Sequence, residues 1–300
     1  MVKLANVDPE LYPFESHYYD IDGLKYHYLD EGEGDPLVML HGNPTWSFYY
    51  RNLVKDLSKT YRTIVPDHIG CGLSDKPSAE DYSYRLMDRV DNLQSLLNHL
   101  DLKDNVTLVL HDWGGMIGLA WARLRPEKIK RLVIFNTSGF HLPATKKLPP
   151  TLKFCRDTKL GASAVLRFNV FARAASKWCV TRKPMSENVK KGYLAPYESY
   201  DDRIATLRFV QDIPLMPGDP SYNLVTETQA QLRQFRNTPT LIVWGAKDFV
   251  FDDHFLREWQ EVMPDAHVHR IPDAGHYVLE DAYDECRSLV SNFLLEHPIH

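Results

Sequence analysis

Cysteine is scarce in this chain of 300 residues, and long apolar runs are missing. The four cysteines are widely scattered and include no C-x-x-C pair, a spacing that argues against a zinc site or a disulfide framework and suits a reducing cytosol. No stretch approaches the roughly 18 uncharged apolar residues of a membrane span. Residues 1–19 include acidic side chains and no continuous apolar segment, which argues against a signal peptide. The sequence therefore predicts a cytoplasmic protein without a membrane span.

An excess of positive charge is missing as well. The formal net charge is −5 and the pI is about 6.2, values that give no broad positive field for nucleic-acid phosphates or anionic lipids. The basic runs 146–147 and 190–191 are short and typical of solvated faces. Nucleic acid is therefore not expected as a partner. A hydrophobic share of 44% is typical of a globular protein and argues against a disordered or fibrous chain.

Short apolar runs alternate with amphipathic stretches over most of the chain. An aromatic-rich hairpin comes first, with Asp22-Gly23 as its two-residue turn. Buried strands are predicted at 37–40, 63–65, 106–110, 132–135, 240–244 and 267–271. Helices with a 3.6-residue period are predicted at 47–57, 84–100, 115–124, 255–262 and 283–295. This order predicts an α/β fold with a mostly parallel sheet flanked by helices.

The alternation stops between residues 140 and 230. This segment has helical patterns around 168–178 and 203–212 but no convincing strand. The simplest interpretation is a core of residues 1–139 plus 231–300, interrupted between its sixth and seventh strands by a helical cap of residues 140–230. Five aromatic side chains are candidates to line an apolar substrate tunnel, although about half of them are expected to pack the cap against the core instead: Phe140, Phe168, Phe171, Trp178 and Phe209.

The segment 109–115 (VLHDWGG) is a strand that runs directly into a helix. A residue at such a sharp turn projects above the sheet, and the following glycines let the helix pack closely. Asp112 takes the place of the serine in the G-x-S-x-G nucleophile motif. An aspartate before a helix is also a common N-cap, but an N-cap does not require the flanking His111, Trp113 and paired glycines. The pattern therefore favours Asp112 as a nucleophilic carboxylate.

Two further junctions carry reactive side chains after predicted strands. Asp248 ends the segment 244–248 (WGAKD), and His276 lies in 273–277 (DAGHY). Functional residues of an open parallel sheet lie where its strands end. The chain order of nucleophile, acid and histidine is the one that α/β-hydrolases use. The sequence therefore predicts an α/β-hydrolase fold with Asp112, Asp248 and His276 as its catalytic residues.

Four segments of the chain strongly resemble the haloalkane dehalogenase family: 41–47 (HGNPTWS), 70–77 (GCGLSDKP), 111–115 (HDWGG) and 275–277 (GHY). The resemblance covers nearly the whole chain. Asp248 and Asn43 look like subfamily III of that family. A second subfamily has Glu where this chain has Asn136, and the first subfamily has an acidic residue where this chain has Asn43. Subfamily III is similar to the β-lactone decarboxylases of bacterial long-chain olefin biosynthesis. The cap segments 195–197, 203–209 and 211–214 look like that branch too.

The residue types suit displacement at a saturated carbon. A carboxylate can displace a leaving group and form an alkyl ester on the enzyme. Water then attacks the ester carbonyl; His276 would deprotonate that water and Asp248 would hold the imidazole in its useful tautomer. The backbone N–H groups of Trp113 and Asn43 would form the oxyanion hole, while the Trp113 indole and the Asn43 amide would hold the departing halide or carboxylate. Their alternatives are a core aromatic and a turn residue. No metal or other cofactor is implied.

Four functions remain to be compared. The leading hypothesis is hydrolysis of a small apolar alkyl halide, and the first alternative is decarboxylation of a cis-β-lactone by the same residues. The second alternative is an epoxide hydrolase, which would need two cap tyrosines from Tyr193, Tyr197 and Tyr200, although Asn43 argues against it. A non-catalytic binding protein is disfavoured because all three catalytic residues are present. Self-association, or assembly with other enzymes of a pathway, is left open.

Overall fold

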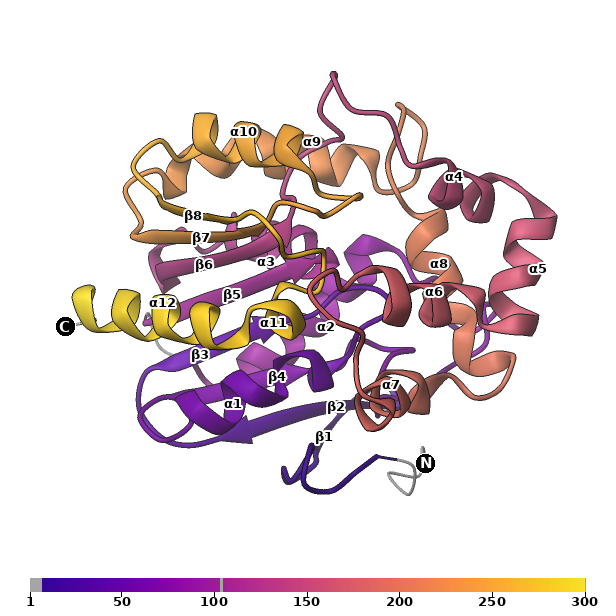
Figure 1. Ribbon diagram of the computed structural model, residues 1–300, viewed down its shortest axis with the longest axis horizontal. Coiled ribbons are helices and arrows are strands. Elements are labelled where there is room, and N and C mark those ends of the chain that lie inside the picture. Colours follow the sequence, from indigo (N-terminus) through magenta and orange to yellow (C-terminus); the bar gives the residue numbers. More distant parts are fainter. Residues whose placement is uncertain (1–6, 103–104, 300) are drawn as a thin grey trace.

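The computed structural model describes residues 7–102 and 105–299, and a single eight-stranded sheet forms its centre (Figure 1). The prediction about a signal peptide concerns residues 1–19, of which 1–6 lie outside the described residues. The order of strands across the sheet is β1-β2-β4-β3-β5-β6-β7-β8. Their bounds are β1 (His17–Ile21), β2 (Leu24–Glu31), β3 (Pro36–Leu40), β4 (Arg62–Pro66), β5 (Val106–Asp112), β6 (Ile129–Thr137), β7 (Thr240–Gly245) and β8 (His267–Ile271).

The sheet is mostly parallel, as the sequence predicts. Strands β3 to β8 pair in parallel, and only β1 with β2 and β2 with β4 are antiparallel. The hairpin turn has positive φ at both Asp22 and Gly23, the conformation that a tight two-residue hairpin requires. All seven residues of β5 are buried, because helices cover both faces of a parallel sheet.

Helices of the core lie on the two faces of the sheet (Figure 1). Their buried side chains belong to two large apolar clusters. One cluster takes residues from α2 (Leu86–His99), α3 (Trp113–Ala122) and α10 (Asp253–Val262). The other takes residues from α1 (Arg51–Leu57), α11 (Val278–Asp281) and α12 (Tyr283–Glu296). Two 3₁₀ turns, η2 (Ser47–Tyr50) and η3 (Pro126–Lys128), complete the core before the cap. The helix expected at 47–57 therefore begins as a 3₁₀ turn.

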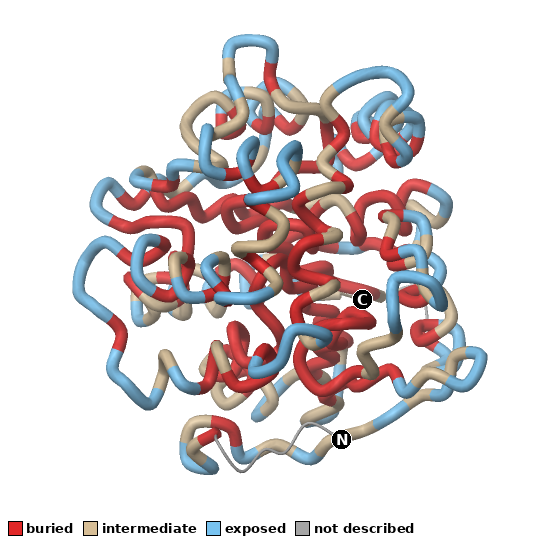
Figure 2. The backbone as a smooth tube through the Cα atoms, turned by 90° about the vertical axis from the view of Figure 1, so that its right-hand side faces the viewer, coloured by how far each residue is buried: buried red, intermediate tan, exposed pale blue. Residues whose placement is uncertain are grey.

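The cap is a set of helices between β6 and β7, and Figure 2 views the molecule from the cap side. Its elements are α4 (Pro150–Asp157), α5 (Lys159–Phe168), α6 (Val170–Trp178), α7 (Glu187–Leu194), η4 (Ala195–Tyr197), η5 (Asp201–Arg203), α8 (Ile204–Gln211) and α9 (Tyr222–Gln231), followed by η6 (Leu232–Phe235). The helical pattern around 168–178 is divided at Asn169, whose left-handed φ of 52° ends α5. In the part of the chain that is described, no helix is long and apolar enough to cross a membrane.

Candidate active site

Asp112 lies at the sharp turn between β5 and α3. Its φ of 52° is a conformation that residues other than glycine rarely adopt, which is typical of strained functional turns. The side chain makes no capping hydrogen bond to α3, so the N-cap interpretation does not describe this aspartate. The hydroxyl of Thr137, at the end of β6, donates to the backbone carbonyl of Asp112 and fixes the turn. The carboxylate is consequently free to face the cavity between core and cap.

The glycines around this turn are required by close packing. A Cβ atom at Gly42 would lie 1.9 Å from Oδ1 of Asp112, and one at Gly114 would lie 1.9 Å from the carbonyl oxygen of Leu40. Neither distance is possible, so any side chain at these positions would push the backbone away from the carboxylate or from β3. The paired glycines after Asp112 thus belong to the geometry of the nucleophile turn.

Asp112, His276 and Asp248 meet at the carboxyl ends of the strands, as the sequence predicts they should. The imidazole Nδ1 of His276 is 2.6 Å from Oδ2 of Asp248, and Nε2 is 3.5 Å from Oδ2 of Asp112. Oδ1 of Asp248 accepts hydrogen bonds from the backbone N–H groups of Val250 (2.7 Å) and Phe251 (3.0 Å). Asp248 is therefore held firmly, and it orients the imidazole toward Asp112.

The charges of these three groups depend on one another. Burial by itself disfavours the imidazolium, but the carboxylates of Asp248 and Asp112 outweigh it and raise the pKa of His276 to about 10. Burial also works against a charge on Asp112, yet His276 and the backbone N–H of Asn43 hold the pKa of this carboxyl below its usual range. At neutral pH the site is an imidazolium between two carboxylates.

His276 is therefore expected to stay protonated well above pH 7. Because its pKa is raised in the folded protein, the resulting stabilisation is complete below the unfolded value of about 6.5 and is lost as the pH rises through about 10. Nitrogen-15 NMR at pH 8 should show both imidazole nitrogens of His276 protonated. In Asp112→Asn, which removes one carboxylate, the same signal should titrate at a lower pH. A neutral His276 at pH 8 in the wild type would contradict this charge arrangement.

Asn43 and Trp113 adjoin the carboxylate from two sides. The backbone N–H of Asn43 donates to Oδ1 of Asp112 at 2.6 Å, and its side-chain Nδ2 donates to the carbonyl of Thr206 in α8 at 3.1 Å. Both Asn43 and Trp113 line the cavity, and the indole packs on the ring of Phe209 with centroids 5.3 Å apart. One amide hydrogen of Asn43 is thus used to tether the cap, which leaves the second for a ligand.

A largely apolar cavity of about 470 Å³ lies between core and cap. Its polar end is formed by the side chains of Asp112 and His276. The rest of its wall is mostly apolar and comes mainly from the loops after β6 and β7, from α4, α6, α8 and α10, and from the loop after α8. It includes Phe140, Leu152, Phe171, Ala175, Trp178, Val210, Ile213, Phe251 and Phe255. The site therefore suits a small apolar substrate with one reactive end.

The structure divides the five tunnel candidates, of which about half were expected to line the cavity. Phe140, Phe171 and Trp178 line the cavity, but Phe168 and Phe209 do not. Phe168 is 65% exposed, because it lies one turn beyond Ala164, the α5 residue that lines the cavity. Phe209 is fully buried under the cavity, where it packs on Trp113 and on the guanidinium of Arg89, while its neighbour in α8 faces the cavity.

Two positioning residues were not assigned a role from the sequence. Asn136 donates from Nδ2 to the carbonyls of Gly245 (3.0 Å) and Phe251 (3.2 Å) and accepts from the N–H of Gly245 (2.7 Å), which ties β6 to the loop that carries Asp248. His111 is fully buried, and its Nε2 is 2.9 Å from the backbone carbonyl of His276. Burial and the charge of His276 lower the pKa of His111 to about 3, so it acts there as a neutral N–H donor.

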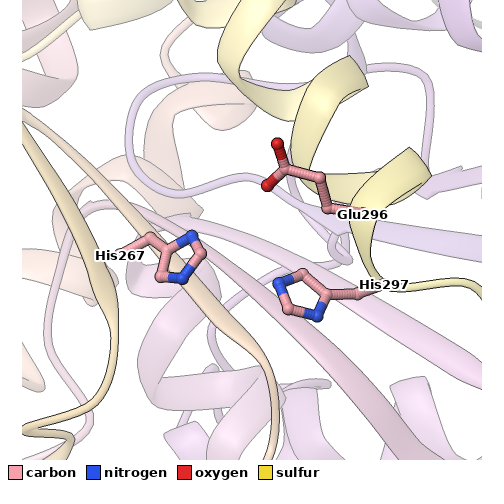
Figure 3. A group of neighbouring side chains, drawn as sticks. All are labelled: His267, Glu296 and His297. Atoms are coloured by element: carbon pink, nitrogen blue, oxygen red, sulfur yellow. The ribbon is translucent and has the colours of Figure 1, made fainter.

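Three possible metal ligands lie at the opposite edge of the sheet. His267 begins β8, and Glu296 and His297 stand at the end of α12; their ligand atoms lie within 4.8 Å of one another (Figure 3). His267 and Glu296 are exposed, and none of the three lines the cavity. The group therefore has no part in the chemistry at Asp112.

Comparisons with known proteins identify the family of the chain. Residues 35–283 match the model of the alpha/beta hydrolase fold family. The chain is 56% identical to a cis-3-alkyl-4-alkyloxetan-2-one decarboxylase of Shewanella oneidensis, over 95% of this chain and 90% of that protein. It is 36% identical to a haloalkane dehalogenase of Mycolicibacterium paratuberculosis, over 91% and 90%. The crystal structure of the haloalkane dehalogenase DatA of Agrobacterium tumefaciens superposes with a TM-score of 0.84 at 26% identity, covering 95% of this chain and 97% of that one. The chain therefore belongs to the α/β-hydrolase fold family, in the branch that holds haloalkane dehalogenases and cis-3-alkyl-4-alkyloxetan-2-one decarboxylases.

Proposed function

We propose that this enzyme decarboxylates cis-3-alkyl-4-alkyloxetan-2-ones, four-membered β-lactones, to alkenes. The observation that carries the proposal is the buried Asp112 carboxylate, paired with His276 at the polar end of an apolar cavity. The substrate is taken from the relative at 56% identity, which is far more similar to this chain than the haloalkane dehalogenase at 36%. An apolar wall suits the two alkyl chains of such a lactone.

The first step is displacement at the ring carbon that bears the ring oxygen, C4. The Asp112 carboxylate forms a C–O bond to C4 as the ring C–O bond breaks, which gives an alkyl ester on the enzyme and a free carboxylate on the substrate. Trp113 and Asn43 both line the cavity, and the indole N–H and the side-chain amide would stabilise that departing carboxylate. Both donors are neutral, so they form no ion pair with Asp112.

The second step releases the product without water. The bond from C3 to the new carboxylate breaks, its electron pair forms the C3=C4 double bond, and the Asp112 carboxylate leaves from C4. Alkene and carbon dioxide are the products, and Asp112 returns to its starting state. The imidazolium of His276, 3.5 Å away, stabilises the carboxylate as its charge returns. Inversion at C4 followed by anti elimination converts a cis-lactone into a cis-alkene.

Dehalogenation is the second candidate, because the same first step on an alkyl halide also gives an ester at Asp112. Hydrolysis of that ester needs a neutral base. Esterification removes one of the two carboxylates that raise the pKa of His276, so the imidazole loses its proton more readily once the ester has formed. The site can therefore supply a base at the stage at which the hydrolytic route needs one.

Epoxide hydrolysis would need cap tyrosines that donate hydrogen bonds to the epoxide oxygen inside the cavity. Tyr193 is buried and donates to Glu280, Tyr197 donates to the carbonyl of Thr45, and Tyr200 is 48% exposed. No tyrosine of the described residues lines the cavity. We therefore do not propose this activity.

A direct assay distinguishes the two remaining candidates. Purified enzyme is given a cis-β-lactone with long alkyl chains, and separately 1-bromobutane, while alkene and bromide are measured. The proposal expects cis-alkene from the lactone and much slower release of bromide. Bromide release without alkene would favour dehalogenation over decarboxylation, and a trans-alkene would contradict inversion at C4 followed by anti elimination.

Trp113→Phe tests the leaving-group donor while it keeps an aromatic ring. Loss of one such donor in a water-excluded site is expected to lower kcat by about 10²- to 10³-fold. Trp121→Phe is a matched control, since its N–H donates to Gln94, outside the cavity. Steady-state kinetics of both variants check the prediction. A Trp113→Phe enzyme within threefold of the wild type would remove Trp113 from the mechanism.

A further inference from the structure

The positive charge of this acidic chain is concentrated at one end of the cap. Residues 144–183 contain ten lysines and arginines and a single acidic residue, Asp157, so this segment carries a formal charge of +9 in a chain whose total is −5. The segment includes α4, α5 and α6. These helices lie together on the right of Figure 1, the side that faces the viewer in Figure 2. The net charge of the whole chain predicted no broad positive field. That sum does not reveal the basic segment, because acidic residues elsewhere in the chain outweigh its charge.

Six of these ten cations form no ion pair with an acidic side chain of the described residues. Carboxylates of the chain pair with Lys146, Lys153, Arg156 and Arg182. In the described part of the chain, six further cations of this segment are exposed and form no ion pair: Lys147, Lys159, Arg167, Arg173, Lys177 and Lys183. Their field is therefore directed to solvent and is available to an anionic surface.

Exposed apolar side chains lie among these cations, around the mouth of the cavity. Four apolar residues both line the cavity and are exposed: Phe154 (42%), Val170 (37%), Trp178 (58%) and Phe249 (41%). Two more, Leu160 (71%) and Phe168 (65%), belong to α5 and point to solvent outside the cavity. An apolar rim surrounded by lysine and arginine is the pattern of a surface that enters the headgroup region of a bilayer.

We propose that α4–α6 dock on an anionic phospholipid bilayer, with the mouth of the cavity facing the lipid. This uses the proposed function only in taking the substrate to be apolar, since such a molecule resides in lipid and would enter the cavity from there. A second copy of the chain does not suit this face, because the unpaired cations of the two copies would repel one another. The mouth lets an apolar molecule pass from the bilayer to Asp112 without crossing water.

Vesicle sedimentation tests the docking without any measurement of turnover, so its failure is separate from a failure of the proposed function. Wild-type enzyme is mixed with sucrose-loaded vesicles of phosphatidylcholine alone or with about a third phosphatidylglycerol. Binding to the anionic vesicles is expected to be at least tenfold stronger and to weaken as salt is added.

Variants of α5 test whether this helix is part of the surface that binds the vesicle. None of the substituted positions lines the cavity. Lys159→Glu with Arg167→Glu should lower binding to anionic vesicles at least tenfold, and Leu160→Ser with Phe168→Ser should also lower it. Arg233→Glu with Arg236→Glu makes the same charge change on the core and should leave binding unchanged. Thermal unfolding verifies that every variant is folded. Equal loss in both charge-reversal pairs, or no loss in either, would overturn the proposal. An absence of vesicle binding would also overturn it and would favour an acidic protein as the partner of this face.

Discussion

Replacing Asp112 by asparagine is expected to lower kcat by about 10⁴-fold or more, because an amide cannot form the ester on which either reaction depends. The two side chains have the same shape, so the turn and the backbone contact from Asn43 need little adjustment. His276 keeps Asp248 as its partner. Steady-state turnover of the cis-lactone measures the loss, and circular dichroism verifies the fold.

Asp91→Asn is a suitable control for this change. Asp91 is exposed on α2 and lies outside the cavity, so its removal should alter kcat by less than twofold. Activity within tenfold of the wild type for Asp112→Asn would mean that another group attacks the substrate.

His276→Ala should separate formation of the ester from its hydrolysis. With 1-bromobutane, the first step needs only the Asp112 carboxylate, whereas the water that cleaves the ester needs a base. The variant is therefore expected to accumulate a butyl ester, with close to one adduct per chain, and to release no more than about one bromide. Intact-mass measurement after incubation checks this outcome.

The double variant Asp112→Asn with His276→Ala should show no adduct, which assigns the ester to Asp112. The cis-lactone should behave differently from the bromide, because decarboxylation consumes no water and needs no base. His276→Ala is thus expected to retain alkene formation at a reduced rate. An adduct-free single variant that still binds bromide would contradict the role assigned to His276.

The sequence predicted that Asp112, Asp248 and His276 lie close together, and the structure brings them together for a physical reason. In an open parallel sheet the carboxyl ends of strands form one edge, so Asp112, Asp248 and His276 needed only to follow three such strands to lie close together. The glycines around Asp112 gave a further local signal for this position. Gly42, for example, can approach the Asp112 carboxylate only because glycine has no side chain. Local pattern and topology were sufficient for these positions.

The cap was less predictable because the orientation of its helices determines which side chains reach the cavity. Phe209 and Val210 are neighbours in α8, yet one is buried under Trp113 and the other forms the wall. Asn169 divides a pattern that was expected to be one helical segment, and Phe168 is left in solvent. The role of Asn136 depends on contacts with the loop after β7, more than a hundred residues away in the chain. Such contacts leave no local signature in a single sequence.

A single-turnover experiment tests the central claim most directly. Enzyme in excess is mixed with a cis-3-alkyl-4-alkyloxetan-2-one, quenched in acid at short times and digested for peptide mass spectrometry. The proposed mechanism predicts a transient adduct of the intact lactone mass on the peptide that contains Asp112, rising before the alkene and decaying as the alkene forms. Alkene formation with no such adduct at any time, or an adduct on a different residue, would contradict it.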